Sequence, residues 1–107
     1  MTKVKVYISG PITGIDPELC RARFAAAKKE LHQRGMEPVS PLENGLPDDA
    51  PYDEHMKRDL EMLADCSIIY MLNGWERSKG CRIEFNTAIT AKKPILFEKE
   101  MQLYGMG

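Results

Sequence analysis

The feature that most limits how this sequence can fold is the apolar run at residues 66–72, Cys-Ser-Ile-Ile-Tyr-Met-Leu. A run this short and continuous is typical of a strand covered on both faces, because half-exposed strands alternate polar and apolar residues. Strands of that kind belong to parallel sheets, whose crossover connections are usually helices. The run therefore predicts an α/β domain with a parallel sheet between layers of helix.

Strand and helix patterns alternate along the rest of the chain. Strands are expected at residues 3–9, 37–41 and 94–97, and helices at residues 17–34, 52–64 and 80–91. The first helix has an Asp-Pro start and a terminal glycine, and a polar, proline-containing loop over residues 42–51 is of the kind that often covers a site. The pattern predicts one domain spanning residues 1–107, a three-layer sandwich around a mostly parallel sheet of four or five strands.

Composition excludes several classes of function. The net charge is −1 with acids and bases interspersed, so no basic stripe indicates a nucleic-acid polymer as partner. Three cysteines without C-x-x-C spacing fit reduced thiols better than disulfides or a zinc site. No apolar run approaches the roughly 20 residues that span a bilayer, and no signal peptide precedes the first strand. We therefore expect a soluble, cytoplasmic protein that does not act on membranes.

Two carboxylates occupy positions where helical periodicity calls for apolar residues. Asp59 lies three residues after Met56 and four before Leu63, so it should point inward. Glu84 should lie in the first turn of the last helix, within a stripe formed by Ile83, Thr87, Ala88 and Ala91. Buried acids are costly unless they are paired or used, so these two mark the candidate site.

The surroundings of the two acids suggest different protonation states. A helix N-terminus favours an ionised Glu84, whereas an apolar environment favours a neutral Asp59, which would supply one base and one acid. The alternative is structural: Glu84 makes a contact at the helix terminus, and Asp59 pairs with Arg58 or Arg77.

Ligands of open α/β sheets bind beyond the carboxyl ends of the strands. The turn Gly-Pro-Ile-Thr-Gly at residues 10–14 follows the first strand, and the loop at residues 73–80 follows the third. The turn lacks the spacing of a P-loop and of G-x-G-x-x-G, so triphosphate hydrolysis and dinucleotide binding are not supported. Its backbone donors could still hold a phosphate or a sugar.

Other residues of this region have two interpretations each. Tyr7 either reaches a carboxylate or packs in the strand, and Trp75 either stacks on a base or closes its loop. Ser78 either binds phosphate or caps the last helix. His32 and His55 have no partner at metal-ligand spacing and are assigned to solvent or structure.

Four segments resemble the nucleoside 2-deoxyribosyltransferase superfamily, and within it the small DUF4406 proteins and the deoxynucleoside 5′-monophosphate N-glycosidases. They are residues 7–14 (YISGPITG), 58–61 (RDLE), 64–69 (ADCSII) and 78–84 (SKGCRIE). The resemblance covers nearly the whole chain, and S-x-G-x-x-x-E with the upstream D-L is its most specific part. It implies a sandwich that is flavodoxin-like or nucleoside deoxyribosyltransferase-like.

The resemblance also implies roles for individual residues. Glu84 resembles the family's nucleophile, Asp59 the acid that assists departure of the base, and Tyr7 the phenol that orients the nucleophile. By the same resemblance, Gly10 and Gly14 would line the sugar or phosphate site and Ser78 would contact a 5′-phosphate. With their neighbours in the turn and the loop, the candidate substrate-binding residues are Gly10, Pro11, Ile12, Thr13, Gly14, Trp75, Ser78 and Gly80. Two departures bear on the phosphate: the glycosidases carry serine and arginine at the positions of Pro11 and Thr13, and transferases often carry aspartate at the position of Ser78.

The chemistry so implied is cleavage or transfer at the N-glycosidic bond of a 2′-deoxynucleoside or its 5′-monophosphate, through a glycosyl-enzyme and without a metal or redox cofactor. The family's members are usually dimers or larger, and an apolar tail at residues 101–107 is compatible with a homodimer or higher oligomer. The alternative is a nucleotide-binding module of the same fold without catalysis. A flavodoxin-like electron carrier is disfavoured, because the loops lack a flavin-phosphate cradle.

Overall fold

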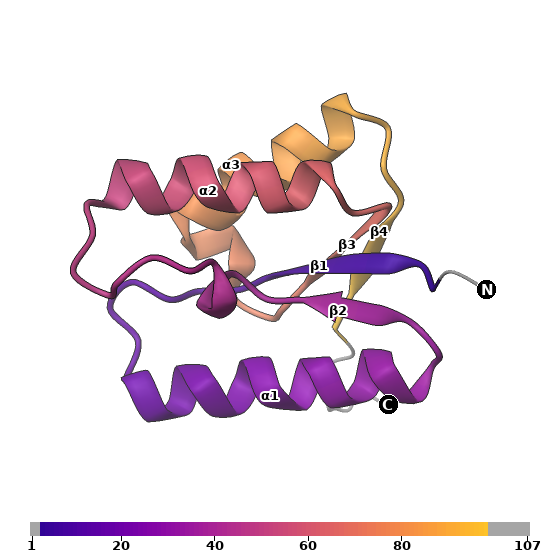
Figure 1. Ribbon diagram of the computed structural model, residues 1–107, viewed down its shortest axis with the longest axis horizontal. Coiled ribbons are helices and arrows are strands. Elements are labelled where there is room, and N and C mark those ends of the chain that lie inside the picture. Colours follow the sequence, from indigo (N-terminus) through magenta and orange to yellow (C-terminus); the bar gives the residue numbers. More distant parts are fainter. Residues whose placement is uncertain (1–2, 99–107) are drawn as a thin grey trace.

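A computed structural model describes residues 3–98, and the apolar tail at residues 101–107 lies outside them. Four strands and three α-helices alternate along the chain (Figure 1). The strands are β1 (Lys5–Ser9), β2 (Glu37–Val39), β3 (Ile68–Met71) and β4 (Ile95–Phe97), and the helices are α1 (Pro17–Gln33), α2 (Tyr52–Ala64) and α3 (Lys79–Thr90). The strands form one sheet in the order β2-β1-β3-β4, and every neighbouring pair is parallel. The predicted fold class is confirmed.

The sheet lies between two helical layers, with α1 on one face and α2 and α3 on the other (Figure 1). Val6 and Ile8 of β1 pack with α1, whereas Tyr7 lies in the second apolar cluster, on the face of α2 and α3. Successive strand residues point to opposite faces, so β1 serves both clusters. All four of Val6, Tyr7, Ile8 and Ser9 are fully buried.

Two of the helices, α1 and α3, begin after a capping side chain. The Asp16 carboxylate accepts a hydrogen bond from the backbone N–H of Leu19 at 3.0 Å, with Pro17 at the first helical position of α1. The hydroxyl of Ser78 accepts one from the N–H of Cys81 at 3.2 Å, which starts α3 at Lys79. These contacts satisfy backbone donors that the first helical turn leaves unpaired.

The structure corrects some sequence-based boundaries. The second strand stops at Val39, and a 3₁₀ turn (Pro41–Glu43) follows it; another 3₁₀ turn, Trp75–Arg77, lies in the loop after β3. The predicted stripe of α3 is also shifted. Thr87 and Ala91 are exposed, and the buried positions are Cys81, Glu84 and Ala88.

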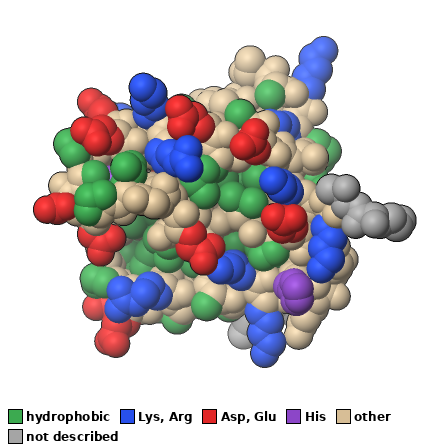
Figure 2. Space-filling model, in the orientation of Figure 1, with side chains coloured by type: hydrophobic (Ala, Val, Ile, Leu, Met, Phe, Trp, Pro, Cys, Tyr) green, Lys and Arg blue, Asp and Glu red, His purple; other side chains and the backbone are tan. Residues whose placement is uncertain are grey.

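Charges of both signs are interspersed on the face shown in Figure 2, as the composition suggests. Within residues 3–98, none of the helices has the length and apolar character needed to cross a membrane. The three cysteines are buried and free.

Candidate active site

Glu84 is held by two hydroxyl groups of β1. Its carboxylate oxygens accept hydrogen bonds from Tyr7 Oη at 2.7 Å and from Ser9 Oγ at 2.6 Å. The two donors lie two residues apart on one strand and so share a face, while α3 brings Glu84 over that face from the far end of the sequence. Glu84 is only 5% exposed, and its carboxylate is therefore fixed in position before any ligand binds.

Burial controls the protonation of Glu84. It raises the pKa to about 7, although the hydrogen bonds from Ser9 and Tyr7 oppose the rise. The prediction that the dipole of α3 favours an ionised Glu84 is wrong, because α3 starts at Lys79 and Glu84 lies in its second turn. The dipole acts mainly within the first turn. Tyr7 has a pKa well above its usual value, chiefly through burial, so its phenol remains a donor.

Asp59 points inward from α2, as its spacing predicts, and is 8% exposed. Its Oδ1 accepts a hydrogen bond from the side-chain amide of Asn44 at 2.9 Å. Burial raises the pKa of Asp59, and the hydrogen bond from Asn44 partly opposes this. Pairing with Arg58 or Arg77 does not occur: Arg58 instead contacts the carbonyl of Asn44 and the carboxylate of Glu61.

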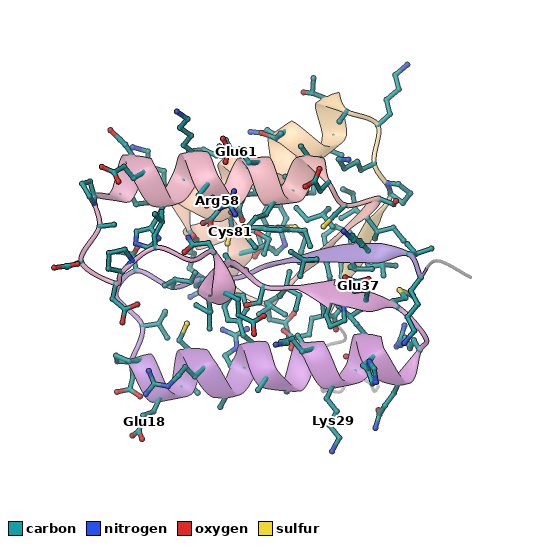
Figure 3. All side chains as sticks on the ribbon, in the orientation of Figure 1. Glu18, Lys29, Glu37, Arg58, Glu61 and Cys81 are labelled. Atoms are coloured by element: carbon teal, nitrogen blue, oxygen red, sulfur yellow. The ribbon has the colours of Figure 1, made fainter. Side chains whose placement is uncertain are left out.

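Asp59 and Glu84 line the same cavity, of about 620 Å³, which we call the carboxylate cavity. Its lining also includes the first turn of α1, with Pro17 and Cys20, and the start of α3, with Gly80 and Cys81. Figure 3 labels Cys81. The loop after β2 contributes Leu42 and Asn44 to the cavity, so that loop does cover the site. A cavity of this size accommodates a ligand of a few hundred daltons.

Only some residues of the turn after β1, at residues 10–14, line the carboxylate cavity. Ile12 and Thr13 line the carboxylate cavity. Gly10 also borders it, but a Cβ there would lie 2.5 Å from the side chain of Leu72, so this glycine is required by packing. Gly14 has a φ of +80° and lines neither of the two cavities described, so its role is conformational.

A second cavity, of about 840 Å³, adjoins the first. The residues that line both are Thr13, Ile15, Tyr52, Ser78 and Gly80. The second cavity is also lined by Pro11 and three cationic side chains, Arg23, Arg77 and Lys79, and we call it the basic cavity. Arg23 donates to the carbonyl of Asn73 at 2.8 Å and contacts Glu98. Within residues 3–98, neither Arg77 nor Lys79 forms an ion pair, so both charges are available to an anion.

Trp75 does not line either cavity. Its ring stacks on Phe85 with the centroids 4.5 Å apart, and it packs against the core beneath α3. This placement favours the interpretation in which Trp75 closes its loop. Ser78 caps α3 and also borders both cavities, so its two interpretations are compatible.

Ser9 and Asn44, which contact the two acids, were missed in the sequence, as were the cationic side chains of the basic cavity. Ser9 could have been found from its spacing, because it follows Tyr7 by two positions on the same strand and so faces the same side of the sheet. Asn44 lies in an irregular loop, where no periodicity indicates which way a side chain points. In the part of the chain that the structure describes, no group of three His, Cys, Asp or Glu residues is arranged to hold a metal ion.

The fold matches solved structures that are larger than this chain. A 2-desoxiribosyltransferase from Leishmania mexicana superposes with a TM-score of 0.69 at 18% identity, over 88% of this chain and 63% of that one. A conserved protein from Enterococcus faecalis V583 gives a TM-score of 0.68 at 19% identity, over 90% and 63%. This chain thus spans less than two thirds of their length. Among curated proteins, none matches.

These similarities define the class: an α/β sandwich with the fold of the nucleoside 2-deoxyribosyltransferases. The family model DUF4406, a domain of unknown function, matches residues 4–97. The chain belongs to the DUF4406 family.

Proposed function

We propose that this protein cleaves or transfers at the N-glycosidic bond of a 2′-deoxynucleoside or its 5′-monophosphate. The observation that carries the proposal is Glu84, a buried carboxylate held by Tyr7 and Ser9 that shares a cavity with a second acid, Asp59. Glycoside cleavage generally uses two carboxyl groups at one site, and in retaining enzymes one of them is the nucleophile. The fold shared with a 2-desoxiribosyltransferase supports the same class of reaction.

In the first step, an oxygen of ionised Glu84 attacks C1′ of the deoxyribose. The C1′–N bond breaks, its electron pair goes to the nucleobase, and Asp59 gives its proton to that base. The developing positive charge on the sugar favours an ionised Glu84 next to it, which offsets the effect of burial on its pKa. The product is an ester between Glu84 and C1′.

In the second step, water attacks C1′ and gives its proton to Asp59, which is now a carboxylate. The ester bond breaks and Glu84 leaves as a carboxylate, so both acids return to their starting states. A second nucleobase that attacks in place of water gives transfer. Neither step requires a metal or redox cofactor.

The basic cavity supports the 5′-monophosphate as the preferred form of the substrate. Arg77 and Lys79 line the basic cavity on either side of Ser78 in the sequence, and Ser78 also lines the carboxylate cavity. A phosphate bound there would meet two cations and the backbone N–H groups at the start of α3. These groups would take the place of the serine and arginine ligands that Pro11 and Thr13 do not provide.

The test is incubation of the purified protein with each deoxynucleoside and deoxynucleoside 5′-monophosphate, with and without a second free base, followed by chromatographic separation of bases. Released base supports the proposal, and exchanged base identifies transfer. Binding of a deoxynucleotide without any released base would instead select the non-catalytic nucleotide-binding module.

A further inference from the structure

A chain of hydrogen bonds joins the loop before α2 to the carboxyl group of Asp59. The backbone N–H of Leu46 donates to Asn44 Oδ1 at 3.0 Å, and Asn44 Nδ2 donates to Asp59 Oδ1 at 2.9 Å. Asn44 Nδ2 also lies 3.0 Å from His55 Nδ1, and His55 Nε2 lies 3.0 Å from the carbonyl oxygen of Pro47. Asn44 is 5% exposed and its hydrogen bond to Asp59 is buried, whereas the contact between His55 and Pro47 is exposed.

The partners fix the direction of every bond in this network. The N–H of Leu46 can only donate, so the Asn44 atom facing it must be the oxygen, and the amide has one orientation. The carbonyl of Pro47 can only accept, so His55 carries a proton on Nε2. The Asn44 amide nitrogen that faces His55 Nδ1 can only donate, so Nδ1 accepts. Both N–H groups of the Asn44 amide are thereby used, one on His55 and one on Asp59.

This direction has a consequence for the acid. Asp59 Oδ1 faces a group that can only donate, so the proton of neutral Asp59 must sit on Oδ2. We propose that Asn44, oriented by His55, is a positioning residue that directs the acidic proton of Asp59 to the oxygen used in the carboxylate cavity. The inference rests on the proposed function and deepens it, since it states which oxygen of Asp59 gives the proton to the leaving nucleobase.

A double-mutant cycle tests whether Asn44 acts through Asp59. Asn44→Ala should lower kcat for base release about tenfold to a hundredfold with little change in KM. In an Asp59→Asn background, Asn44→Ala should have almost no further effect on kcat, because the acidic proton that Asn44 directs is absent. An equal loss in both backgrounds would overturn the proposal.

Arg58→Met is the matched control. Arg58 Nε donates to the backbone carbonyl of Asn44 at 3.1 Å from the same helix, on which Figure 3 labels it, and so fastens the same loop without touching Asp59. If Asn44 merely anchors the loop, Arg58→Met should slow base release as much as Asn44→Ala does. We expect kcat of the Arg58→Met protein to stay close to that of the wild type.

A measurement independent of turnover separates this inference from the proposed function. In carboxyl-labelled protein, a ¹³C NMR titration should show a higher pKa for Asp59 in Asn44→Ala than in the wild type, because a donor to the ionised form is lost. Arg58→Met should leave that pKa unchanged. If the wild type releases no base yet this shift appears, the hydrogen-bond network stands and the proposed function fails; if base is released but the shift is absent, the inference fails alone.

Asn44→Asp provides a second variant in case the alanine protein does not fold. It keeps the shape of the side chain and the acceptor for Leu46, but places a carboxyl group against Asp59. Two acids sharing one site raise the pKa of one of them. If neither Asp59 nor the introduced carboxyl group titrates with a pKa above that of wild-type Asp59, the contact on which the inference depends is contradicted.

Discussion

Glu84 and Asp59 contribute to the proposed reaction in different ways, and their variants should differ accordingly. Glu84→Gln should keep the fold and ligand binding but lose more than about 10⁴-fold in kcat, because an amide cannot form the ester. Asp59→Asn should lose less, about 10²- to 10⁴-fold with a poor leaving base and little with a good one, since it removes only proton donation. Steady-state kinetics with substrates of graded leaving ability tests this order; near-wild-type turnover by Glu84→Gln would make Glu84 a structural residue.

The ionisation of Glu84 should set the acid side of the pH profile. Because the attacking group is the carboxylate, kcat/KM should fall as the pH drops through about 7, the pKa of Glu84. Ser9→Ala removes a hydrogen bond that lowers this pKa, so the fall should begin at higher pH. Profiles of the two proteins under identical buffers measure the difference; superimposable profiles would show that Ser9 does not tune the nucleophile.

The same carboxyl group should make stability depend on pH. The folded-state pKa of Glu84, about 7, exceeds the ordinary value of 4.5, so folding favours its neutral form. The neutral form of Glu84 contributes its full share to the free energy of unfolding below about pH 4.5. This share is lost as the pH rises through 7, which lowers the free energy of unfolding by an amount of order 3 kcal/mol. Glu84→Gln should remove this loss and be the more stable protein above pH 7. Urea unfolding at several pH values tests the sign, and a wild type whose stability rises over that interval relative to the variant would contradict it.

At the scale of the residue, spacing indicated the two acids, and Tyr7 was a candidate partner for a carboxylate, but Ser9 and Asn44 were not found. Asp59 was predictable because helical periodicity places it with Leu63, and Glu84 because it interrupts an apolar stripe. The pKa of Glu84 was not predictable, since it depends on burial beneath α3 and on two hydroxyls of a distant strand. Asn44 could not be found either, because its orientation is set by contacts between a loop and a helix.

At the scale of the element, the junction between the Trp75–Arg77 turn and α3 should decide the preference for a phosphate. Arg77→Gln and Lys79→Gln should each lower kcat/KM for the deoxynucleoside 5′-monophosphate by about tenfold, the worth of one charge-assisted contact, and leave the deoxynucleoside almost unaffected. Lys57→Gln on α2 is the control, because this exposed lysine lines neither cavity. Equal effects on both substrates would remove the basic cavity from phosphate recognition.

The elements themselves were largely predictable. Asp16-Pro17 and the glycine after α1 specify that helix, and the predicted bounds of α2 are those observed. The two 3₁₀ turns were not predicted, because each is held by a few local hydrogen bonds rather than by a repeating pattern. The buried face of α3 includes Glu84 and Ala88, as predicted, but it also includes Cys81 and excludes Thr87 and Ala91. Small or partly polar residues such as Ala91 and Thr87 tolerate exposure, so periodicity alone did not fix this face.

At the scale of the whole molecule, we propose a homodimer or higher oligomer in which a neighbour completes the carboxylate cavity. Ile12, Leu42 and Tyr52 line that cavity and yet are 39%, 40% and 44% exposed. Sedimentation equilibrium should show association of the wild type, and Leu42→Glu should weaken it by placing a charge at an apolar contact. Ile89→Glu is the control, because Ile89 is exposed outside both cavities. A monomer at all concentrations would contradict the proposal.

The whole-molecule architecture followed from the alternation of strands and helices, and the parallel sheet from the apolar run of β3. The sequence alone did not determine the strand order, which depends on which edges the crossovers reach. That order places β1 inside the sheet, between β2 and β3.

The interior position of β1 also has a consequence for the time at which the site forms. The hydroxyls that hold Glu84 precede it by 75 and 77 residues, so a growing chain carries them long before their partner exists. Closing contacts over such separations is slow, and β1 gains its second neighbour only when β3 has been made. The reactive carboxylate is therefore assembled late and cooperatively. A chain cut short before α3 contains the strand that would hold the nucleophile but not the nucleophile itself.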